Sequence, residues 1–439
     1  MLEVAIATVG LVAVFVLPVR VVALAFGVLL PIDFVQFIDP LYFDAARYGL
    51  AVILALRLRR TSSEPTHRGW AVSSALMIGL VGLVAAIKGY GEEGSLFTTG
   101  VTMLLSVAVS YQIARRTQVH SRILLGFVVG NLLSSIDIIF QYVGLPYIGM
   151  PSEWGDRYSG FSHISTTAAP LLAVSILIVI GMMERLREAP ARHPMLLITS
   201  GLAVGTLMLA LVLTNGRGGL VGLFAGILLL VVRGLRDGRA SAFVAILVAI
   251  AAGFNYRTTI TGYFVRDGRT DLSSGRVERN ADALAAFLRE PLLGPDARVI
   301  QGLNPHTPIL SFGLFAGLAG VIIALLLMWR LVRLAWEGIW AESTASVLLG
   351  MVSAVILVAS LLEPDGFFVG LAPLVILLIV FSAGPDVGRA PGGISGGEGR
   401  HRDPVAGASM RLEANFGGAA GNRLGIVGAA SARQVNGAT

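Results

Sequence analysis

The sequence predicts an all-α protein that crosses a membrane many times. Of its 439 residues, 55% are hydrophobic and only 14% are charged, and the mean hydropathy is +0.78. Charged residues make up about 25% of an ordinary soluble domain. Apolar runs of about 17 to 25 residues, long enough to cross a bilayer as helices, recur along the chain with short basic clusters between them.

The apolar runs can be followed in order. The opening run, 2–31, is interrupted by Pro18 and Arg20, so it predicts either two short spans or one long kinked span. The chain is therefore expected to have 12 or 13 transmembrane helices, which fill residues 1–254 and 309–383. The other predicted spans are 43–59, 68–88, 96–114, 122–142, 165–184, 195–214, 217–234, 240–254, 309–330, 344–362 and 366–382.

The basic clusters predict which loops face the cytoplasm. They fall on every second loop, as expected from the excess of arginine and lysine in cytoplasmic loops: Arg57–Arg60, Arg115–Arg116, Arg185–Arg192, Arg233–Arg239 and Arg330–Arg333. This grouping explains the net charge of +6 and argues against nucleic acid as a partner. Arginine outnumbers lysine so strongly that Lys88 is the only lysine, a bias that we attribute to codon usage.

The largest polar segment, 255–308, is predicted to be an extracytoplasmic loop. It contains seven arginines, and long loops cross the membrane regardless of charge. Residues 384–439 are rich in Gly, Ala, Ser and Arg and too poor in apolar residues to form a core, so we expect a disordered cytoplasmic tail.

Within the large loop the sequence predicts a short amphipathic helix over the membrane face. Val277, Ala281, Leu284 and Leu288 recur at helical spacing, a serine at 273 or 274 can cap the start, and Pro291 and Gly294 end it. Arg276 stands at the beginning of this helix. A helix N-terminus beside a guanidinium favours phosphate binding.

Other candidate residues lie on outward-facing loops. His306 precedes the span that follows the large loop, and its imidazole can serve as a general base near neutral pH; His163 is a competitor on another loop. Arg157 and Arg217 lie on two further outward turns. Several arginines at a bilayer edge are costly unless partnered, and a shared anion explains them best.

Two alternatives rest on carboxylates. Asp137 lies inside a span and could be a proton or ion site, as in a transporter or flippase of lipid-linked sugars, or a polar contact between helices. Asp33, Asp39 and Asp44 on the first outward loop could instead bind a divalent metal.

The glycine spacing predicts how some helices pack, and the absence of cysteine limits the chemistry of the chain. The glycine stripes Gly218, Gly222, Gly226 and Gly313, Gly317 indicate close helix packing. The chain has no cysteine, which excludes disulfides and thiolate sites.

Several of these segments together resemble the O-antigen ligase and O-antigen polymerase family. His306-Thr307, nine further residues and Gly317-Leu318-Ala319-Gly320 are similar to the ligase pattern of His, then Asn, Ser or Gln, nine residues and G-x-x-G, with threonine as a departure. The resemblance covers about residues 140–335 and departs from the family's Asn-Pro-Asn at Ser162-His163-Ile164. Its further parts are Asn215-Gly216-Arg217-Gly218, Ser274-Gly275-Arg276, Glu290-Pro291-Leu292-Leu293-Gly294 and Arg157-Tyr158-Ser159-Gly160.

The resemblance implies a GT-C-like helical membrane domain with glycosyltransferase activity on the extracytoplasmic face of the bacterial cytoplasmic membrane. It implies a polyprenyl-diphosphate-linked glycan donor, a glycan or lipid acceptor, and an inverting, metal-independent reaction that needs no cofactor. Arg157, Arg217 and Arg276 would bind the diphosphate, and His306 would be the base. Polymerase, ligase and transfer to protein remain open.

Overall fold

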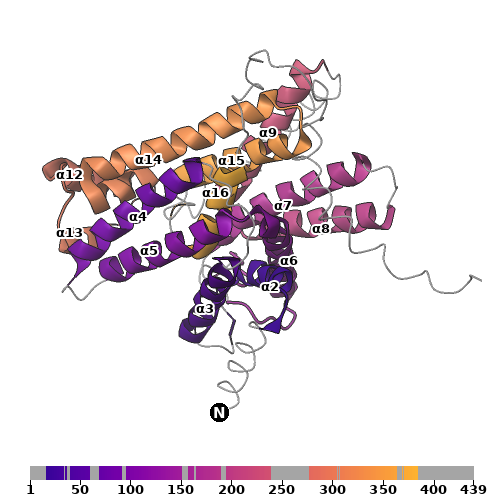
Figure 1. The fold of residues 1–439 in the computed structure, drawn as a ribbon, viewed down its shortest axis with the longest axis horizontal. Helices are drawn as coiled ribbons and strands as arrows, with labels where there is room; N and C mark the ends of the chain where they lie inside the picture. The colour runs from indigo at the N-terminus through magenta and orange to yellow at the C-terminus, as the bar shows by residue number, and fades with distance from the viewer. Residues whose placement is uncertain are drawn as a thin grey trace, which may run out of the picture. The chain divides into compact units, whose positions relative to one another are not determined.

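In the computed structural model, the described part of the chain is built from α-helices joined by loops and turns (Figure 1). The described residues are 16–33, 35–36, 40–59, 69–90, 95–150, 157–162, 165–188, 194–238, 276–303, 305, 307–362, 368 and 370–383. They all belong to the first of two compact units, Met1–Pro385 and Asp386–Thr439. The predicted tail therefore lies outside the described residues.

The helices agree closely with the predicted apolar runs. Their bounds are α2 (Val19–Leu29), α3 (Pro40–Arg59), α4 (Gly69–Gly89), α5 (Ser95–Ala114), α6 (Thr117–Val143), α7 (Ser165–Glu188), α8 (Pro194–Leu213), α9 (Arg217–Arg236), α12 (Arg276–Arg289), α13 (Ala297–Gln301), α14 (Pro308–Trp340), α15 (Thr344–Leu362) and α16 (Leu371–Ala383).

By length and composition, eight of the described helices could each cross a membrane: α4 to α9, α14 and α15. The shorter α2 and α16 are also apolar. Helix α3 covers the predicted span 43–59 but is less apolar, because it carries Asp44, Arg47, Arg57 and Arg59. The predicted span 240–254 and the first half of the run 2–31 lie outside the described residues, so the total of 12 or 13 stays a prediction.

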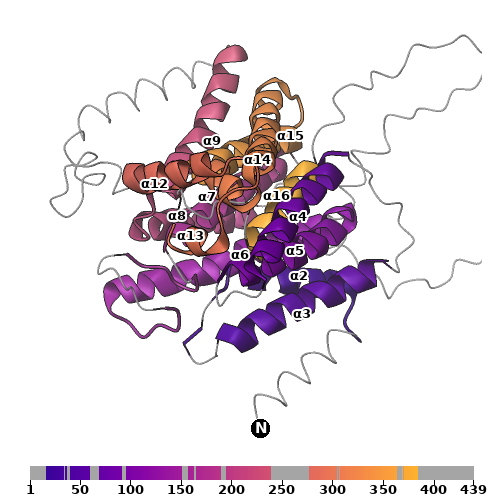
Figure 2. The ribbon, with the colours of Figure 1, turned by 90° about the vertical axis from the view of Figure 1, so that its left-hand side faces the viewer.

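Close helix contacts depend on glycine, as the predicted stripe in α9 indicates. Gly222 faces Val355 of α15, and Gly226 faces both α15 and Leu177 of α7. Gly219 lies against the backbone of Ala169 in α7, so closely that a β-carbon would overlap it. Helix α9 therefore packs tightly on α7 and α15, while α4 lies between α5 and α14 (Figure 1). Helices α4 and α5 lie side by side (Figure 2).

Helix α14 differs from the predicted straight span 309–330. Its backbone leaves the helical region at Ala316 (φ −130°, ψ 19°) and Gly317 (φ +62°, ψ −147°). A β-carbon on Gly313 would lie 3.0 Å from Val321 Cγ2, although residues eight apart on a straight helix are separated by roughly 12 Å. The segment 308–315 therefore folds back along the start of the long segment 318–340. Gly317 serves this reversal and also lies against the Leu292 carbonyl, so both glycines of the predicted pair stand at close contacts.

Contacts between arginine and tryptophan side chains link α14 to the start of α4 and to the end of α9. The Arg333 guanidinium lies 4.9 Å from the ring centre of Trp70 at the start of α4. Arg236, at the end of α9, lies 5.5 Å from the ring of Trp340 at the end of α14. Such side chains are typical of membrane–water interfaces. Arg233 and Arg236 thus lie near the end of α14, in which Arg330 and Arg333 stand inside the helix and not in the predicted loop. The side of the membrane on which these arginines lie stays a prediction.

Candidate functional site

The turn that contains Arg157 is held against α6 by its backbone. The Phe161 N–H donates to Ser134 Oγ at 3.1 Å, and the Met150 N–H donates to the Gly160 carbonyl at 2.9 Å. Gly160 has φ +58°, and a β-carbon there would crowd the Ser134 hydroxyl. The R-x-x-G pattern therefore needs its glycine for the shape of the turn.

Asp137 fixes the neighbouring loop. Its buried carboxylate accepts hydrogen bonds from the backbone N–H groups of Ile148 at 2.8 Å and Gly149 at 3.1 Å, and from Gln141 Nε2 at 2.7 Å. Gly149 in turn lies against the Gly160 carbonyl. Asp137 therefore has a structural role, but its contacts are with a loop and with its own helix and not the predicted contact between helices.

The structure brings the backbone segments of Arg157 and Arg217 together. The N–H of Tyr158 donates to the carbonyl of Leu213, the last residue of α8, at 3.5 Å. The turn 214–216 follows, with Asn215 in the left-handed region at φ +53°, and Arg217 is the first residue of α9. Both arginines are half-buried. Two of the four predicted site residues thus share one end of the helix bundle.

The structure describes the other two predicted site residues, Arg276 and His306, only in part or not at all. Arg276 begins α12, so its predicted position at a helix N-terminus is confirmed, but its side chain lies outside the described residues. His306 and the competitor His163 also lie outside them. Thr307, next to His306, is the N-cap of α14 and its hydroxyl accepts the Leu310 N–H at 3.4 Å.

Helix α12 packs on α14 through a face that the sequence analysis did not identify. The buried residues are Ala283 and Ala286. Of the apolar stripe that predicted the helix, Val277, Leu284 and Leu288 are exposed. The spacing identified the helix correctly because both faces share the same helical period.

The Pro-Leu-Leu-Gly loop lies against the reversal in α14. The N–H of Leu318 donates to the Pro291 carbonyl at 2.7 Å, and Gly317 meets the Leu292 carbonyl. The sequence analysis assigned no role to Lys88. Its ammonium donates hydrogen bonds to the carbonyls of Leu293, Gly294 and Pro295. The signal that could have identified it is its being the only lysine.

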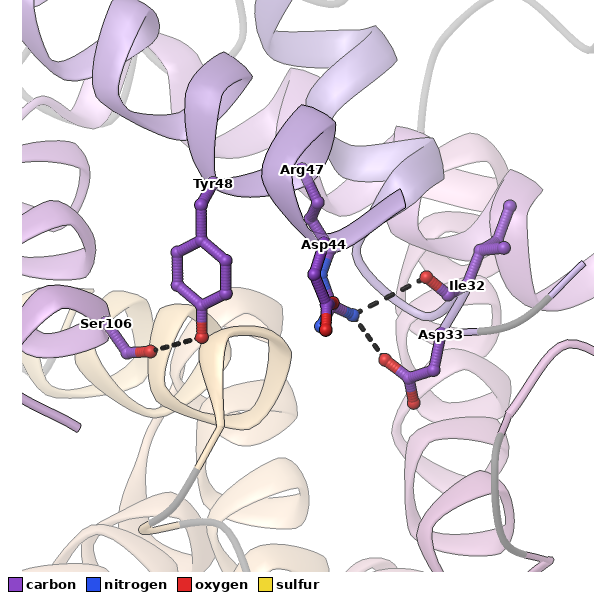
Figure 3. A network of polar contacts seen from close by, with 6 residues as sticks. All are labelled: Ile32, Asp33, Asp44, Arg47, Tyr48 and Ser106. Carbon is purple, nitrogen blue, oxygen red and sulfur yellow. Dashed lines mark hydrogen bonds and ion pairs between the residues drawn. The ribbon is translucent and has the colours of Figure 1, made fainter. Parts of the chain in front are cut away.

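Two of the carboxylates considered for a metal are bound to an arginine (Figure 3). Arg47 is buried, forms ion pairs with Asp33 and with Asp44 (2.8 Å), and donates to the Ile32 carbonyl at 3.4 Å. Asp39 lies outside the described residues. Within the described part of the chain, no group of three or more His, Cys, Asp or Glu residues is arranged to hold a metal ion.

Comparison with known families gives one match. The O-antigen ligase model matches residues 202–295, which include Arg217, Arg276 and the Pro-Leu-Leu-Gly loop but neither Arg157 nor His306. No match was found among curated proteins. Together with its apolar helices, the match supports an O-antigen ligase or polymerase type of membrane enzyme. It supports the assignment of this chain to the O-antigen ligase and polymerase family, which its motifs resemble.

Proposed function

We propose that the protein transfers a glycan from a polyprenyl-diphosphate donor to an acceptor hydroxyl at the extracytoplasmic end of its helices. The observation that carries this proposal is the position of Arg217. It is half-buried and is the first residue of α9, and the preceding helix α8 ends at Leu213, whose carbonyl accepts the N–H of Tyr158 next to Arg157. The family match to residues 202–295 supports the reaction class.

The position of Arg217 favours an anion on electrostatic grounds. The N-terminus of a helix carries a partial positive charge, so a cation there is unfavourable by itself. A diphosphate bound there would gain both the backbone N–H groups and the guanidinium, and Arg276 at the start of α12 would add a second such position.

The proposed chemistry is an in-line displacement at the anomeric carbon. His306 takes the proton from the acceptor hydroxyl as its oxygen forms a bond to that carbon. The bond between the carbon and the phosphate oxygen breaks, and the diphosphate leaves with the electron pair. Arg157, Arg217 and Arg276 stabilise the negative charge that develops on the leaving diphosphate. In this scheme the guanidinium groups neutralise that charge and no metal ion is needed. Attack from the opposite face inverts the configuration.

The direct test is His306→Ala in purified protein reconstituted with a polyprenyl-diphosphate-linked glycan and an acceptor. Removing a general base lowers the rate by roughly 10²–10⁴-fold. Arg289→Ala, an exposed substitution in α12, is the control and should keep wild-type transfer. An active His306→Ala variant would contradict the proposed mechanism.

The acceptor class can be read from surface glycans after deletion of the gene. Loss of long chains with single repeat units remaining identifies a polymerase. Accumulation of complete polymer on its lipid carrier identifies a ligase.

A further inference from the structure

The only lysine in the chain binds the backbone of the Pro-Leu-Leu-Gly loop. Lys88 lies in the last turn of α4, and its Nζ donates to the carbonyl of Leu293, to that of Gly294 at 3.0 Å and to that of Pro295 at 3.4 Å. These contacts link residues more than 200 positions apart in the sequence.

Lysine suits this position better than arginine does. An ammonium is a compact charge with three rotatable donors, so it can serve three successive carbonyls that converge on one point. A guanidinium holds its donors in a rigid planar fork. The chain uses arginine at every other basic position apart from histidines, yet it keeps lysine here.

The opposite end of the same loop lies in the break of α14. The Leu318 N–H donates to the Pro291 carbonyl at 2.7 Å, and Gly317, at φ +62°, leaves room for the Leu292 carbonyl. Gly294, at the end of the loop that Lys88 contacts, also lies close to α14: a β-carbon on it would lie 2.5 Å from the Leu314 carbonyl. The loop is therefore held from α4 at one end and fits into the reversal of α14 at the other.

We propose that Lys88 is a positioning residue for His306, acting through this loop and the break at Gly317. In the sequence, the loop leads directly into α13 and then to His306. The folded-back segment Pro308–Phe315 begins two residues after His306. We call these contacts the clamp: they involve residues 291–295, before the proposed base in the sequence, and residues 314–318, after it. The inference rests on the proposed function, because it assigns the clamp to the same site.

The first test compares Lys88→Met with Gly317→Ala, which act on opposite ends of the loop. A displacement of the base by about 1 Å can lower turnover about a hundredfold. Each variant should therefore lower kcat with little change in the donor KM. The double variant should be no slower than either single variant, since both release the same element. Gly201→Ala in α8, where a β-carbon meets open space, is the matched control. Wild-type kcat in Lys88→Met, or independent losses in the double variant, would overturn the proposal.

The second test needs no transfer activity. Because Lys88 is the only lysine, peptide-resolved amine labelling reports on its ammonium alone, and an exposed Arg289→Lys substitution supplies a reference amine in the same molecule. Lys88 should react more slowly than this reference, and Gly317→Ala should remove the difference. Equal labelling in the parent, or unchanged protection in Gly317→Ala, would exclude the clamp. If protection is seen in a protein without transferase activity, the proposed function fails while the clamp itself stands.

Discussion

At the residue scale, the proposed diphosphate site depends on the planar fork of Arg217. Two parallel hydrogen bonds to phosphate oxygens require a guanidinium, and an ammonium cannot reproduce them. We therefore expect Arg217→Lys to lower transfer by about tenfold or more, the loss of one charge-assisted bond. The same change at exposed Arg289 should leave transfer unaltered. Equal effects at both positions, measured in the reconstituted assay, would argue against a diphosphate at Arg217.

Arg47 illustrates a different use of arginine, in the stability of the fold. Its side chain is 10% exposed and pairs with the side chains of Asp33, 27% exposed, and Asp44, 50% exposed. The Asp33 N–H also donates to the Phe161 carbonyl at 2.8 Å, so this network holds the turn of Arg157. Arg47 therefore fixes Asp33 and the first part of α3 beside the turn of Arg157.

Removing that guanidinium leaves two carboxylates without their counter-charge. We expect Arg47→Met to reduce the free energy of unfolding by about 2–3 kcal/mol, below the range for fully buried pairs because Asp44 is half exposed. Thermal unfolding in detergent measures this. Arg47→Met combined with Asp33→Asn should recover part of the loss, and the control Arg289→Met should cost less than about 1 kcal/mol. An unchanged midpoint in Arg47→Met would show that the network contributes nothing.

At the element scale, the close approach of the start of α9 to α7 depends on Gly219. A side chain at Gly219 would overlap the backbone of Ala169, which cannot rotate away as a side chain could. Gly219→Val should therefore destabilise the protein by about 1–3 kcal/mol or more, the usual cost of overpacking. It should also displace Arg217 two residues away. Gly205→Val in α8, where nothing lies within 4 Å, is the control. Equal thermal midpoints for the two variants would contradict this account.

The break in α14 explains why helix periodicity was an incomplete guide for this element. Residues 308–340 are apolar enough to read as one long span, and hydropathy alone does not distinguish a straight helix from one that folds back. The reversal depends on the left-handed backbone of Gly317 and on the loop carbonyls that fill it. Those carbonyls come from residues 291 and 292, so the break is a tertiary feature.

At the scale of the whole molecule, the predicted sidedness can be tested without removing any residue, because the chain has no cysteine. Single cysteines at exposed positions, Arg289→Cys in α12 and Glu342→Cys after α14, should give opposite results. A membrane-impermeant maleimide should label the first in intact cells and the second only after permeabilisation. The cysteine-free parent is the blank. Labelling of both from the same side would refute the predicted topology.

The sequence by itself determined the helical membrane class, the positions of the described apolar helices and the amphipathic helix at 276–289, because hydropathy and helical period are local properties of the chain. Its short motifs, which are also local, indicated a resemblance to the O-antigen ligase and polymerase family that the match to residues 202–295 supports. The tertiary structure decided which residues meet: Arg157's turn with the end of α8, Asp33 with Arg47, and Lys88 with a loop more than 200 residues away. These pairings depend on how the helices pack, and packing is set by contacts between residues distant in sequence, such as Gly219 with Ala169. For that reason Lys88 could be counted in the sequence but assigned a role only in the fold.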